Sequence, residues 1–87
     1  MRFKVELHRD VVWFIRHVCS PDERRDFQER LDRLRDDPLA DSEPFADEKF
    51  SRRVLRVFFF GRNAAVFRLD LHRERIVVFE CHRLRGK

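Results

Sequence analysis

The spacing of the apolar residues changes twice along the chain, and the order of these changes constrains the fold most. Apolar and polar residues alternate over residues 2–7, which is typical of a half-buried strand. From residue 10 the apolar residues stand three and four apart, as on one face of a helix. Alternation returns after residue 51 and continues to residue 82. The sequence therefore predicts a strand, a helical middle and a second group of strands.

The first predicted helix begins near Asp10. Its apolar residues fall on one side, and Trp13 widens the apolar stripe, so we expect a well-buried helix with Trp13 in the core. The residues at helical spacing are Val11, Phe14, Ile15 and Val18.

The second predicted helix begins at the sequence SPDE, residues 20–23. Ser20 is a capping residue, Pro21 suits the first helical position, and Glu23 stands three residues beyond the cap. A narrow apolar stripe follows, which favours packing on the sheet, although it would also accept part of a partner protein. The stripe consists of Phe27, Leu31 and Leu34. Pro38 ends the helix, and we expect residues 38–51 to form a surface loop.

Three strands are predicted in the last third of the chain, over residues 52–60, 64–71 and 75–82, joined by the turns GRN and HRE. The residues expected to face the core are Leu55, Val57 and Phe59 in the first of these strands, and Ala65, Phe67 and Leu69 in the second. The predicted fold is α+β with the order β-α-α-β-β-β. Two N-terminal helices would pack on one face of a small, twisted, mostly antiparallel sheet, in a single domain over residues 1–87.

Composition limits the class of protein. Charged residues make up 41% of the chain and hydrophobic residues 43%, which indicates a globular protein rather than a disordered one. No run of apolar residues has the length of a signal peptide or a membrane span, so we expect a cytoplasmic protein without a membrane partner. Cys19 and Cys81 are too isolated for a disulfide framework and are expected to fill the core.

The charge is distributed unevenly along the chain. Residues 1–50 carry a net charge of −3, whereas residues 51–87 carry +7, and nine of the ten cations in this second part are arginines. Arginine binds phosphate oxygens through a planar, permanently charged group, so a polyanion is the first partner to consider. An acidic protein segment would bind the same surface, and a solvated sheet face with scattered ion pairs is the structural alternative.

The cations of the second part alternate with aromatic residues. On the outward side of the three strands we expect cations to lie within reach of one another, with Phe58 and Phe60 between them. They are Arg52, Arg56, Arg68, His82, Arg83 and Arg85. Such a surface suits phosphates and unstacked bases.

Three stretches of the chain resemble one family. VLRVFFFGRNAAVFRLD, RIVVFECHRLR and RLDRLRDDPLADSEPF resemble the strand, hairpin, C-terminal basic segment and helix end of the RelE/ParE superfamily of small bacterial toxins, including its HigB-like, phage-derived branch. The resemblance implies the toxin of a toxin–antitoxin system, held inactive by a cognate acidic antitoxin. It implies action on mRNA in the ribosome, or on DNA gyrase in the ParE branch. Operator DNA would be contacted only through the antitoxin.

The resemblance also implies site residues. Arg56 matches a basic residue of the first strand of the hairpin, and His82 with Arg83 matches the basic pair after the last strand. Metal-free RNA cleavage needs a proton carrier and cations that hold the charge on phosphorus. We therefore expect Arg56 and Arg83 to hold the scissile phosphate, and His82 to move a proton or to orient the phosphate. The residues expected to bind the RNA backbone are Arg52, Arg68, Arg85 and Lys87.

Two departures favour a second hypothesis. Nuclease members usually place an arginine where this chain has Ala64 and Ala65, and some members have a terminal tyrosine that is absent here. The alternative is a non-catalytic binding module, either a ParE-like gyrase inhibitor or a degenerate homologue that binds only RNA or a partner protein. No metal or cofactor is expected, because His8, His17 and His72 lack the spacing of metal ligands.

Overall fold

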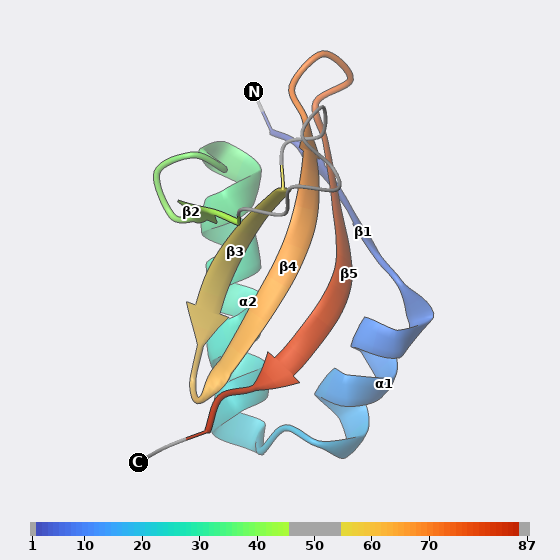
Figure 1. Ribbon diagram of the computed structural model, residues 1–87, viewed down its shortest axis with the longest axis vertical. Helices are drawn as coiled ribbons and strands as arrows, with labels where there is room; N and C mark the ends of the chain where they lie inside the picture. The colour runs from blue at the N-terminus through green and yellow to red at the C-terminus, as the bar shows by residue number, and fades with distance from the viewer. Residues whose placement is uncertain (1, 46–54, 86–87) are drawn as a thin grey trace.

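The computed structural model describes residues 2–45 and 55–85 and shows two helices packed on a mixed sheet (Figure 1). The elements are β1 (Lys4–Leu7), α1 (Arg9–His17), α2 (Pro21–Asp36), β2 (Glu43–Pro44), β3 (Leu55–Phe60), β4 (Asn63–Asp70) and β5 (Arg75–Arg83). The predicted α+β class and the order of its main elements are confirmed. The short strand β2 was not predicted and lies within the expected loop, of which residues 46–51 lie outside the described residues.

The sheet has the strand order β1-β5-β4-β3-β2. Strand β1 runs parallel to β5, with Lys4 opposite Arg75 and Leu7 opposite Val78, and the remaining neighbours are antiparallel. The last strand of the chain therefore lies inside the sheet, between the first strand and the hairpin of β3 and β4. No helix in the described ranges is long and apolar enough to cross a membrane.

The core lies between the helices and one face of the sheet. Phe27 of α2 packs against β3, with its ring centroid 4.8 Å from that of Phe60 and 5.9 Å from that of Phe58. Several fully buried side chains complete this layer, including Val11, Leu34, Phe67, Ile76 and Val78. Burying such large aromatic and aliphatic groups is the main stabilising contribution available to a domain of this size.

The predicted orientation of β3 is wrong. Phe58 and Phe60 face the helices with 2% and 1% of their surface exposed, whereas Phe59 is 44% exposed. Val57 is buried on the opposite face of the sheet, in a second cluster with Ala64 and Val66. The reason is that β3 is apolar on both of its faces, so alternation alone does not identify the face that the helices cover.

Strand β4 follows the prediction, because Ala65, Phe67 and Leu69 are buried in the helix-facing core and Arg68 is exposed.

Helix α1 differs from the prediction that Trp13 lies in the core. The helix begins at Arg9 after His8, which caps it, and Trp13 is 59% exposed and stacks on His17 with 5.1 Å between ring centroids. Trp13 stands two residues after the fully buried Val11, about 200° around the helix, and so points away from the core.

Candidate functional site

The β3–β4 turn, the start of α2 and the end of β5 meet at one end of the sheet (Figure 1). A backbone hydrogen bond of 2.7 Å from the N–H of Leu84 to the carbonyl of Arg62 joins the last segment to the turn. We call the exposed residues Arg62, Arg83 and Arg85 the basic end. It holds two of the predicted site residues, together with Arg62, which was not predicted.

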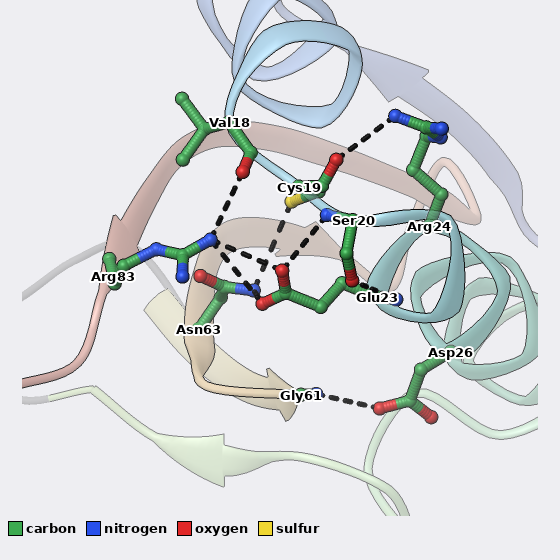
Figure 2. A network of polar contacts seen from close by, with 9 residues as sticks. All are labelled: Val18, Cys19, Ser20, Glu23, Arg24, Asp26, Gly61, Asn63 and Arg83. Carbon is green, nitrogen blue, oxygen red and sulfur yellow. Dashed lines mark hydrogen bonds and ion pairs between the residues drawn. The ribbon is translucent and has the colours of Figure 1, made fainter. Parts of the chain in front are cut away.

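Arg83 is held on one side by α2 and the segment before it (Figure 2). Its Nη2 donates to the carbonyl of Val18 at 3.1 Å and to Glu23 Oε1 at 3.2 Å. The side chain remains 44% exposed. Its Nε and Nη1 atoms make no hydrogen bond within the described residues. The guanidinium is therefore fixed through one nitrogen while the other two can reach a ligand.

Glu23 is the centre of this network (Figure 2). It forms the predicted capping box, in which the N–H of Ser20 donates to Glu23 Oε1 at 2.9 Å and the N–H of Glu23 donates to Ser20 Oγ at 3.2 Å. The buried Asn63 donates from Nδ2 to Glu23 Oε2 at 2.6 Å. The Ser20 bond, assisted by Asn63 and Arg83 and opposed by burial, lowers the pKa of Glu23 to about 2. Glu23 is therefore ionised at neutral pH.

The β3–β4 turn is fastened to the same part of α2. The N–H of Gly61 donates to Asp26 Oδ2 at 2.7 Å. Gly61 has a φ of +53°, which glycine adopts without strain, and a Cβ there would lie 2.9 Å from Cγ of Glu23. The turn therefore needs glycine both for its backbone and for its close approach to Glu23.

His82 lies on the other face of the sheet from Arg83. In the register of β4 and β5, Asn63 is opposite Arg83 and Ala64 is opposite His82, and successive strand residues point to opposite faces. The half-exposed His82 contacts Glu80, with 3.1 Å between Nε2 and Oε2. The structure therefore brings His82 and Arg83 to the same strand end without bringing the imidazole and the guanidinium together.

Arg56 lies far from the basic end. It donates from Nη2 to the carbonyl of Ser42 at 2.8 Å and from Nε to the hydroxyl of Ser42, and so fastens the segment that follows α2. Arg83 contacts the first turn of α2, and a 16-residue helix is about 24 Å long. Arg56 and Arg83 are therefore anchored near opposite ends of this helix.

The prediction that Arg56 and Arg68 share a face is also wrong. Arg56 is opposite Phe67, which faces the helices, whereas Arg68 is opposite Leu55 and points to the other side. The reason is again that β3 is apolar on both faces, so alternation does not show to which side Arg56 points. Arg52 and Lys87 lie outside the described residues.

Comparison with solved structures identifies the fold. The whole chain superposes on 99% of a chain of the archaeal RelE–RelB complex from Pyrococcus horikoshii OT3, with a TM-score of 0.82 and 19% sequence identity. The chain has the RelE fold. No model of a known protein family and no curated protein sequence matches it. The resemblance seen in the sequence is thus confirmed at the level of the fold.

Within this RelE fold, three residues of the site were not predicted as such. In the sequence, Glu23 was assigned only a helix-capping role, and Asn63 was assigned to a turn. Arg62 could not be distinguished from the many other arginines. A fully buried asparagine indicates that its amide has a hydrogen-bond partner, but the burial of Asn63 is known only from the position of β4 in the folded protein.

The two cysteines behave as predicted, because Cys19 is buried in the core and Cys81 packs against it. Burial raises the pKa of Cys19 and raises that of Cys81 to about 12, so both thiols are poor nucleophiles. Over residues 2–45 and 55–85, no three histidine, cysteine or acidic side chains are close enough to hold a metal ion.

Proposed function

We propose that this protein is the toxin of a toxin–antitoxin pair and that it cleaves mRNA in the ribosome through the basic end. The RelE fold supports the toxin role, and the neighbour of known structure is a complex of RelE with RelB. The observation that carries the choice of site is Arg83, an exposed arginine fixed through one nitrogen with its remaining donors open. Arg83 binds the scissile phosphate, and Arg62 and Arg85 bind the RNA backbone.

His82 is the proton carrier in this proposal. It stands next to Arg83 in sequence but on the other face of the sheet. An RNA strand that contacts both side chains therefore crosses the end of β5 rather than lying along one face. Arg56 is left out of the cleavage site, since its donors hold the segment after α2.

The proposal is tested by mapping mRNA 5′ ends in a reconstituted translation reaction, with and without ribosomes. We expect discrete, ribosome-dependent cuts, and a rate reduced about 10²- to 10³-fold by Arg83→Ala, as for loss of one donor to a charged transition state. His82→Ala should also slow cleavage. The control is Arg73→Ala, an exposed arginine in the β4–β5 turn at the other end of the sheet. Cuts that persist in Arg83→Ala would exclude the proposed site.

One observation favours a second function. The imidazole of His82 contacts Glu80 and points away from Arg83, so the described residues do not form a compact acid–base site. A non-catalytic module that binds gyrase, RNA or a partner protein needs no such site. Intact mRNA during active translation, together with DNA breaks and loss of supercoiling by gyrase, would support the gyrase inhibitor. Intact mRNA with RNA binding alone would support the degenerate homologue.

An antitoxin surface is also part of the proposal. A cavity of about 280 Å³ lies between α1 and α2. Its apolar lining consists of Leu7, Val12, Ile15, Phe27 and Leu31, with Arg16, Arg24 and Gln28 beside them. Both arginines are exposed. An apolar cavity next to two cations suits an amphipathic acidic helix, whose apolar residues enter the groove while its carboxylates meet the arginines.

Fluorescence measures antitoxin binding directly, because Trp13 is the only tryptophan of the chain and stands exposed on α1. We expect its emission to change when the acidic protein encoded by a neighbouring reading frame is added. Arg16→Glu should weaken binding at least tenfold by reversing one contact charge. Arg33→Glu makes the same change at an exposed position that does not line the cavity. Equal affinities for the two variants would rule out this groove.

A further inference from the structure

We infer that Glu23 and Asn63 are positioning residues for Arg83, so that the start of α2 fixes the direction of the phosphate-binding guanidinium. The inference deepens the proposed function and rests on it in assigning the phosphate to Arg83. The three residues lie far apart in the sequence and meet only in the folded protein (Figure 2).

The first step is that the Glu23 carboxylate has one orientation. Its two oxygens accept from Ser20 N–H at 2.9 Å and from Asn63 Nδ2 at 2.6 Å. Asn63 is fully buried, and the turn approaches Glu23 so closely that a Cβ at Gly61 would lie 2.9 Å from Glu23 Cγ. Asn63 Oδ1 has no hydrogen-bond partner in the described part of the chain, so the amide acts on the network through Nδ2 alone.

The second step is that this carboxylate orders Arg83. An arginine at the end of a strand has many rotamers, and confining them on ligand binding costs free energy. Nη2 of Arg83 is already fixed by Glu23 Oε1 and by the Val18 carbonyl. The Arg83 side chain is therefore already ordered before a ligand binds, and its Nε and Nη1 atoms point in one direction.

The third step separates positioning from attraction. The Glu23 charge offsets part of the Arg83 charge, so Glu23 weakens the long-range attraction of RNA rather than strengthening it. Glu23→Gln keeps the shape of the side chain and makes the protein more positive by one charge. It should therefore lower kcat without raising KM, because orientation is lost and attraction is not.

The experiment measures kcat and KM for ribosome-dependent cleavage by the folded full chain. We expect Glu23→Gln to lower kcat about 10- to 100-fold with KM unchanged or lower. Asn63→Ala removes the 2.6 Å bond but keeps the Glu23 charge, and should lower kcat in the same way. The double variant Glu23→Gln/Arg83→Ala should be no slower than Arg83→Ala, since Glu23 acts through Arg83. Asp26→Asn is the control, because Asp26 binds Gly61 in the same region without touching Arg83.

A second measurement keeps this test separate from the proposed function. In NMR spectra, the Arg83 Nη protons should be resolved in the wild type and averaged in Glu23→Gln. A normal kcat in Glu23→Gln, while Arg83→Ala is inactive, would overturn the positioning role and leave the proposed function intact. If the wild type does not cleave mRNA, the proposed function fails and the NMR comparison decides alone. Averaged Arg83 signals in the wild type would then overturn the inference, and resolved signals that are lost in Glu23→Gln would support it.

Discussion

Phe58→Ala is expected to lower the free energy of unfolding by about 3–5 kcal/mol, which is the usual cost of truncating a fully buried phenylalanine. Phe58 is 2% exposed and packs between Phe27 and Phe67, at centroid distances of 5.9 and 6.0 Å. A domain of this size has a total stability of roughly 5–10 kcal/mol. Much of the variant should therefore unfold at low denaturant. Urea unfolding followed by circular dichroism measures the loss.

The neighbouring residue provides a matched control. Phe59→Ala removes the same atoms one position further along β3, from a side chain that is 44% exposed. We expect a loss of no more than about 1 kcal/mol, as for a substitution outside the core. A larger loss for Phe59 than for Phe58 would show that β3 presents its other face to the helices.

Acid should remove the contribution of Glu23 to stability. Its hydrogen bond from Ser20, together with Asn63 and Arg83, lowers its pKa from 4.5 to about 2 in the folded protein. A lowered folded-state pKa stabilises the protein above the unfolded-state pKa, and this stability is lost as the pH falls through the folded-state value. This contribution is therefore fully present above about pH 5 and is lost as the pH falls towards 2.

Glu23→Gln isolates this contribution from that of the other carboxylates. The wild type should be more stable than the variant at pH 7, and the difference should shrink towards pH 2, where Glu23 is half protonated. Unfolding in urea at several pH values gives the comparison. Asp22→Asn, which removes an exposed carboxylate from the same helical turn, is the control. A constant difference between wild type and Glu23→Gln would show that the ionised carboxylate makes no special contribution.

Local patterns predicted the elements well because each depends on neighbouring residues. The capping box at Ser20 and the inward residues of β4 were recognisable from spacing and residue type. The orientation of β3 was not, since Val57, Phe58 and Phe60 are all buried, on two different faces. Only pairing with β4, in which Phe58 stands opposite Ala65, determines which face the helices cover.

The candidate site was even harder to predict from local sequence patterns than the orientation of β3. The C-terminal cations were candidates from the sequence, and Arg83 at the end of β5 and Arg85 just after it are both exposed. The partners of Arg83 were beyond sequence reasoning, because Glu23 lies 60 residues away in the sequence and Asn63 contacts Glu23 across 40 residues. The separation of His82 from Arg83 by the sheet follows from strand alternation, but identifying the contacts on each face requires the register of β4 and β5.

The parallel pairing of β1 with β5 has a consequence for how the protein is made. Residue 4 pairs with residue 75, and β5 lies between β1 and β4. During synthesis, β1 and α1 emerge early, and β1 has no neighbouring strand until β5 has left the exit tunnel. Such long-range pairing is slow to form, and it joins the two parts of the sheet only after β5 has been made. Since Arg83 belongs to that same strand, its hydrogen bonds to Val18 and Glu23 also form only after β5 has been synthesised.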